Sequence, residues 1–238
     1  MDDKLQHQSI QYDLHRLVVL MIFIGASIAA TGVYLSVWFE YQNIGIDVLN
    51  HRADFLGDYT KTPYAFIYNM SLMVAGLCTL LSMTGLYLLR LSSFSRYLSL
   101  SGSVVGLSIV LMGMFPINYL EVHRLISTCY LIGTVVMFFL CISDKFSHNS
   151  VCSWPVFFLS VLGFIAASGL VLQLNWHTLD YTPCINHTIK QHYCWVAITM
   201  WTLTNIIMLW CLAFAWSIRN IAIKNYLELS QRYLAGEY

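Results

Sequence analysis

The chain has 238 residues, of which 58% are hydrophobic and 10% are charged. Soluble globular domains average about 45–50% and about 25%, so this composition excludes an ordinary soluble protein. Lysine plus arginine and aspartate plus glutamate each number 12. This balance leaves no net field that would attract nucleic acid as a partner.

Six apolar stretches are each long enough to cross a bilayer as a helix. The hydrocarbon core is about 30 Å thick and requires roughly 20 apolar residues in helical form. Lipid offers no partner to an unpaired backbone amide, so each span must be helical. None of the six contains Lys, Arg, Asp or Glu. The sequence therefore predicts an all-α membrane domain over residues 1–238, with six transmembrane helices at about 17–39, 64–89, 97–115, 125–142, 151–174 and 195–218.

The distribution of Lys and Arg between the loops predicts which side of the membrane each loop faces. The side that holds both termini carries eight of these residues, and the opposite side carries four. Because cytoplasmic loops are enriched in Lys and Arg, we expect the N-terminus and the C-terminus to be cytoplasmic. The loops at about 40–63 and 175–194, and the corner after Pro116, then face outward.

The outward loop before the second span carries Asp54 and Asp58, and Asn69 follows inside that span. An amide side chain at membrane depth must find a hydrogen-bond partner, because its desolvation is otherwise costly. Two interpretations of Asn69 are open. It either bonds to a neighbouring helix and fixes the bundle, or it lines a polar cavity.

The corner after the third span brings ionisable residues to the start of the fourth. Pro116 is a natural stop for the third helix. Glu121 can pair locally with Arg124, and such a surface pair contributes about 0–1 kcal/mol. His123 lies at the edge of an apolar span, where it is either a hydrogen-bonded structural group or a functional one. The candidates for a polar cavity are therefore Asn69, Asp54, Asp58, Glu121, His123 and Arg124.

The last outward loop contains Cys184 and Cys194. In an oxidising compartment these two cysteines would be expected to form a disulfide. The alternatives are two unrelated loop thiols and a zinc site that also uses His187 and His192, but the spacing C-x2-H-x4-H-x-C matches no familiar structural zinc pattern. We predict no metal and no cofactor. Nucleotide-binding and hydrolase motifs are absent from the sequence, which leaves enzymatic activity uncertain.

Two stretches resemble a known family. Residues 53–58 (ADFLGD) and 64–77 (YAFIYNMSLMVAGL) are similar to a pattern ISxLG followed by IFNxSLIxAGLL, although Ala53-Asp54 replaces the usual Ile-Ser. Residues 113–123 (GMFPINYLEVH) resemble the family's VGxFP stretch and its following histidine. The family is the prokaryotic six-span group called domain of unknown function 998, which distantly resembles the eukaryotic FRAG/DRAM membrane proteins.

The resemblance implies a six-helix bundle in the plasma (inner) membrane of a prokaryote. It also implies that the functional positions are Asn69, Pro116 and His123. The eukaryotic group is tied to lipid remodelling and membrane trafficking, which suggests membrane lipid as the partner by analogy alone.

Three functions are compatible with these features. The first is lipid handling or lipid sensing in an outward-facing polar cavity. The second is an intramembrane lipid hydrolase or transferase, in which His123, Glu121 and Asp54 or Asp58 act as acid, base or metal ligands. The third is a non-enzymatic protein of the immunity type that protects or accompanies another membrane protein through its outward loops.

Overall fold

The computed structural model of the chain describes residues 2–147, 150–181 and 194–234. Its long elements are six α-helices, each apolar enough over 18 residues or more to cross a membrane. This confirms the predicted all-α membrane fold. Their bounds are α1 Asp2–Ile44, α2 Ala65–Leu89, α3 Ser93–Met114, α4 Leu120–Asp144, α5 Trp154–Gln173 and α6 Trp195–Leu234.

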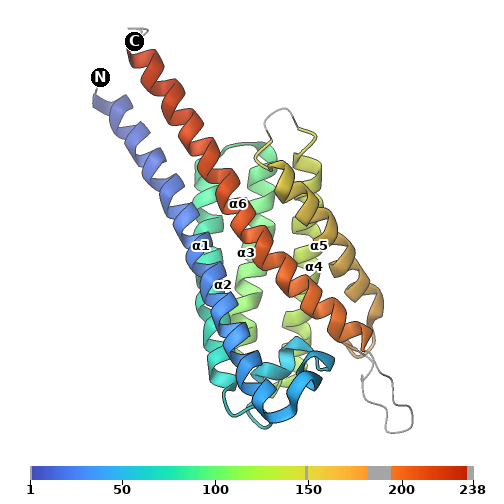
Figure 1. Cartoon of the computed structure of the whole chain (residues 1–238). Coiled ribbons are helices and arrows are strands. Elements are labelled where there is room, and N and C mark those ends of the chain that lie inside the picture. Colours follow the sequence, from blue (N-terminus) through green and yellow to red (C-terminus); the bar gives the residue numbers. More distant parts are fainter. Residues whose placement is uncertain (1, 148–149, 182–193, 235–238) are drawn as a thin grey trace.

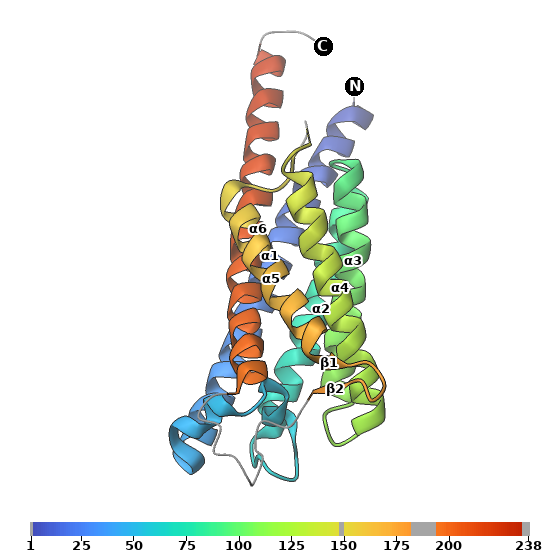
Figure 2. The ribbon, with the colours of Figure 1, turned by 90° about the vertical axis from the view of Figure 1, so that its right-hand side faces the viewer.

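The helices form a closed ring in chain order. Each packs against the helices before and after it in the chain, and α6 packs back against α1. The chain runs up and down in turn, so both termini lie at one end of the bundle (Figure 1). Figures 1 and 2 show α1 and α6 projecting beyond the other helices at that end.

The opposite end of the ring carries the short elements. Between α1 and α2 lie two 3-10 helices, η1 Gly45–Asn50 and η2 Ala53–Gly57. Between α5 and α6 the strands β1 Leu174–Asn175 and β2 Asp180–Tyr181 form an antiparallel pair, in which Leu174 faces Tyr181. The segment between α1 and α2 lies under the helix ends in both views (Figures 1 and 2), and Figure 2 shows β1 and β2 at the same end.

Small residues bring α2 and α3 into close contact. A Cβ atom added at Gly76 would lie 2.7 Å from the backbone nitrogen of Val110, and one at Gly113 would lie 2.6 Å from the carbonyl oxygen of Asn69. In lipid, where apolar burial between helices adds little, such backbone contact is a main source of helix association. A short turn also joins these two helices. It begins at Arg90, whose φ of 49° is left-handed.

Several helices extend past the predicted spans. α1 begins at Asp2 and ends at Ile44, and α4 begins at Leu120. The prediction used the apolar run alone, whereas a helix continues through polar residues once it leaves the hydrocarbon, because water then solvates their side chains. α6 likewise continues without a break to Leu234.

Candidate functional site: a cavity closed by a charge cluster

The segment between α1 and α2 is bound to the helices around it. Leu56 is fully buried. The Trp201 indole nitrogen on α6 donates to the carbonyl oxygen of His51 at 3.1 Å. The Thr62 hydroxyl donates to the carbonyl oxygen of Phe55 at 2.9 Å. These contacts fix the position of η2 under the open end of the ring.

Asn69 provides a further attachment from inside α2. Its side chain is buried, and Nδ2 donates to the carbonyl oxygen of Gly57 at 3.1 Å. A Cβ atom at residue 57 would lie 2.6 Å from Oδ1 of Asn69, so this approach depends on a glycine. The partner of Asn69 is thus the backbone of η2 and not a neighbouring helix. The same residue also lines the cavity described below.

Five side chains form a charge cluster at this end: Arg52, Asp54, His123, Arg124 and Asp180. Arg52 donates from Nε to Asp54 Oδ1 at 3.2 Å and from Nη1 to Asp180 Oδ1 at 2.8 Å, and its Nη2 also contacts Asp54 Oδ2. Arg124 reaches Asp180 through its Nη2. The carboxylate of Asp180 therefore joins the loop before α2 to the start of α4.

The cluster holds its carboxylates in the charged form. Burial raises the pKa of Asp54, but its polar contacts with His123 and Arg52 outweigh burial, so the pKa lies below its ordinary value. Burial likewise raises the pKa of Asp180. Hydrogen bonds from Arg52, the Tyr181 backbone and Arg124 lower this pKa by more than burial raises it, so it also lies below its ordinary value. Burial raises the pKa of Tyr181 to about 12, so its phenol stays neutral beneath the Arg52 guanidinium, which lies 5.3 Å from the ring centre.

Both ring nitrogens of His123 are directed at fixed groups. Nδ1 lies 2.9 Å from the carbonyl oxygen of Phe115. A carbonyl oxygen only accepts, so Nδ1 carries a proton. Nε2 lies 3.8 Å from Oδ2 of Asp54. His123 thereby connects the end of α3 to the charge cluster from a buried position.

Two other predicted residues lie outside the cavity wall. Asp58 accepts hydrogen bonds from the Thr60 hydroxyl at 2.6 Å and from Asn118 Nδ2 at 2.9 Å, and so fixes the corner before α4 to the loop before α2. Glu121 is exposed. In the described part of the chain it forms no ion pair, and Arg124 pairs with Asp180 instead. The local Glu121–Arg124 pair expected from the spacing is therefore wrong.

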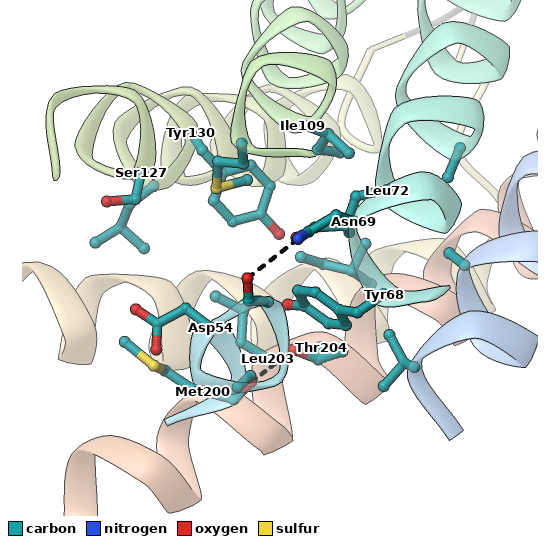
Figure 3. A pocket seen from close by; sticks show the side chains of 18 of the residues that line it. Asp54, Tyr68, Asn69, Leu72, Ile109, Ser127, Tyr130, Met200, Leu203 and Thr204 are labelled. Atoms are coloured by element: carbon teal, nitrogen blue, oxygen red, sulfur yellow. Dashed lines mark hydrogen bonds between the residues drawn. The ribbon is translucent and has the colours of Figure 1, made fainter. Parts of the chain in front are cut away.

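Above the cluster lies a cavity of about 200 Å³ inside the ring (Figure 3). Its polar end is lined by Arg52, Asp54 and His123, together with Asn69. Figure 3 shows the hydroxyl groups of Tyr68 and Tyr130 pointing into the space between α2, α4 and α6.

Away from the cluster the cavity is apolar and elongated. Its lining on α2 extends from Tyr68 to Thr79, a rise of about 16 Å at 1.5 Å per residue. The α6 lining extends from Met200 to Cys211, which is the same length. The hydroxyl of Thr79 donates to a backbone carbonyl of its own helix at 2.9 Å, so it adds no unpaired polar group to the inner end.

Of the six residues predicted to line a polar cavity, the structure places Asn69, Asp54 and His123 in its wall. Arg124 lies in the charge cluster behind the wall. Sequence reasoning did not single out Arg52 and Asp180 as partners. Each was visible as a charged residue in an outward loop, but nothing in the sequence linked the two loops.

Two predictions concern the last loop. Cys184, His187 and His192 lie outside the described residues, so the Cys184–Cys194 disulfide stays a prediction. Among residues 2–147, 150–181 and 194–234, no group of three or more His, Cys, Asp or Glu side chains is arranged to hold a metal ion.

A closed ring of six apolar helices with a polar-capped internal cavity defines an integral, multi-pass membrane protein. The family model for DUF998, a protein of unknown function, matches residues 28–217. The chain belongs to this family, as the motif resemblance predicted. No curated protein and no solved structure matches it.

Proposed function

We propose that the protein holds a membrane lipid in this cavity and acts without catalysis, as a lipid-handling or lipid-sensing bundle. The cavity itself carries the proposal. One end presents charged and hydroxyl groups from the loops, and the other end is an apolar tube between helices. A lipid has the same division between a polar head and an apolar tail. The tail of a membrane lipid would pass from hydrocarbon into an apolar tube, so its transfer costs little and the polar end supplies the selectivity.

The level of the polar groups supports this proposal. η2 and β2 lie where the helices end, at the height where a bilayer changes from hydrocarbon to headgroups. A lipid of the same leaflet would enter with its head already beside Asp54 and its chain directed along α2 and α6. No group would have to cross the apolar part of the membrane.

The geometry of His123 argues against the hydrolase or transferase alternative. A catalytic histidine needs one ring nitrogen free to take a proton from a nucleophile while the other is oriented by a fixed partner. In His123 the fixed partner is the carbonyl oxygen of Phe115, and the remaining nitrogen faces the Asp54 carboxylate and not a hydroxyl or thiol. This arrangement suits a structural wall better than a general base.

Native mass spectrometry of the purified protein tests the proposal. We expect the wild-type chain to retain a bound lipid after release from mild detergent, and solvent extraction would then identify it. Replacement Ile207→Trp places an indole in the lining of the tube and should remove the adduct. Wild-type protein that carries no lipid mass would contradict the proposal.

Leu209→Trp is the matched control for that substitution. Leu209 lies two residues further along α6, is 55% exposed and does not line the cavity. It should keep the adduct. His123→Ala probes the polar end and should reduce the fraction of protein that carries a lipid. The helical circular dichroism signal checks that all three variants are folded.

A further inference from the structure

The positive charges at the polar end of the cavity are already neutralised. All three nitrogens of the Arg52 guanidinium contact Asp54 or Asp180, and Arg124 contacts Asp180. Two arginines face two aspartates, so with a neutral His123 imidazole the cluster carries no net charge. A phosphate or carboxylate head would have to break these pairs, and it would meet the Asp54 carboxylate in the cavity wall.

A cationic head would gain little binding energy from Asp54, because Arg52 already neutralises that carboxylate. Both oxygens of Asp54 are occupied by Arg52. An ammonium group that approached Asp54 would therefore stand beside a guanidinium that is already in place, and like charges in contact cost several kcal/mol. The balanced cluster favours a head without net charge.

The cavity does offer hydrogen bonds to a neutral head. The Tyr68 hydroxyl points into it (Figure 3), and no hydrogen bond of that hydroxyl is found among the described residues. It can donate to a ligand oxygen. A carboxylate oxygen has lone pairs beyond those that a bidentate arginine uses, so Asp54 can accept from a ligand hydroxyl. A hydroxyl group on the ligand satisfies both.

The apolar part is too narrow for two chains side by side. A volume of about 200 Å³ spread over a length of about 16 Å leaves a narrow tube. Sites for drug-sized ligands are about 300–1,000 Å³, and this one is smaller. A lipid with two chains would have to leave one of them outside the ring.

From these features we propose that the ligand is a single-chain lipid with an uncharged, hydroxyl-bearing head, of the monoacylglycerol or long-chain alcohol class. This inference rests on the proposed function, because it names the lipid that the same cavity would hold. It assigns Tyr68 and Asp54 to the head and the lining of α2 and α6 to the chain.

Binding of compounds that share one monounsaturated 18-carbon chain and differ in their heads tests the inference. The purified protein is titrated with mono-oleoylglycerol, oleate, oleoyl lysophosphatidic acid and oleylamine, and the 1:1 adduct is counted by native mass spectrometry. We expect mono-oleoylglycerol to bind roughly tenfold or more tightly than the charged compounds. Dioleoylglycerol, with two chains and one free hydroxyl, should bind more weakly than ethylene glycol mono-oleate, which has one chain and the same single hydroxyl.

The outcomes separate the two proposals. Equal or tighter binding of oleate, lysophosphatidic acid or oleylamine would overturn the neutral head, and equal binding of dioleoylglycerol would overturn the single chain. Either result leaves lipid binding intact. If none of the probes binds and the purified chain retains no lipid, both proposals fail.

Tyr68→Phe probes the head contact directly. It removes one hydroxyl and keeps the ring in the wall, so mono-oleoylglycerol should bind about fivefold more weakly, the loss expected for one hydrogen bond. Tyr64→Phe is the control, because Tyr64 is exposed just before α2 and does not line the cavity. It should bind as the wild type does. Unchanged affinity of the Tyr68→Phe protein would overturn the assignment of the head.

Discussion

Asp180 joins two arginines that come from distant parts of the chain. Oδ1 accepts from Arg52 in the loop before α2, and Oδ2 contacts Arg124 in α4. The side chains of all three are about one-quarter exposed. At that depth an ion pair is worth more than at a free surface, because water screens it less. Loss of this one carboxylate would leave Arg52 with Asp54 alone and would remove the ion pair of Arg124.

We predict that Asp180→Asn lowers the free energy of unfolding at pH 7 by about 1–3 kcal/mol, between the effects usual for exposed and for buried pairs. Equilibrium unfolding in SDS, followed by circular dichroism, measures it. The pKa of Asp180 in the folded protein lies below its ordinary value of 3.8. Its contribution should therefore be complete above that value and disappear as the pH falls through the lower, folded pKa.

Asp47→Asn serves as the control for this prediction. Asp47 is an exposed carboxylate in η1 whose side chain contacts Asn50 at 3.3 Å. Its loss should change stability by less than about 0.5 kcal/mol. Equal effects of the two substitutions, or a difference between wild type and Asp180→Asn that grows as the pH is lowered below 3.8, would contradict the role assigned to Asp180.

At the scale of elements, the interface between α2 and α3 depends on backbone contact. At Gly76 and Gly113 an added Cβ atom would meet backbone atoms of the other helix at 2.6–2.8 Å. These atoms cannot rotate away as a side chain would. The same interface places Asn69, next to the Gly113 contact, against η2. Separation of the two helices would therefore also disturb the polar end of the cavity.

Gly113→Ala should accordingly destabilise the protein by about 1–3 kcal/mol, the usual cost of overpacking. Gly169→Ala in α5 is the matched control. A Cβ atom there meets nothing within 4 Å, and alanine is the better helix former by up to about 1 kcal/mol. It should leave stability unchanged or raise it. Unfolding in SDS compares the two, and a stable Gly113→Ala protein would show that α2 and α3 are free to move apart.

Apolar length predicted the six helices well, because only a helix satisfies the backbone in lipid. The same criterion could not predict where α1 or α4 ends outside the hydrocarbon. The site was harder to predict. Asn69 and His123 were visible as polar residues in or beside apolar spans. The pairing of Arg124 with Asp180 across 56 positions was not, because local spacing made Glu121 the nearer partner.

At the scale of the whole molecule, an even number of spans places both termini at one end of the bundle (Figure 1). The elements that carry the charge cluster, η2, β2 and the start of α4, lie at the opposite end. Exposed basic residues lie at both ends of the bundle. Lys61 lies in the loop before α2, beside the cluster, and Arg96 lies in the first turns of α3, near the end that carries the termini. The excess of Lys and Arg at the terminal end predicts that this end is cytoplasmic.

This orientation decides which leaflet could supply the cavity, and chemical labelling tests it. In spheroplasts, a membrane-impermeant maleimide should react with Lys61→Cys and should reach Arg96→Cys only after permeabilisation. The wild-type chain, which has seven cysteines, gives the background, and labelling in detergent shows that both positions are accessible. The reverse pattern would place the termini outside. The charge cluster would then face the cytoplasm, and the cavity would take its lipid from the inner leaflet.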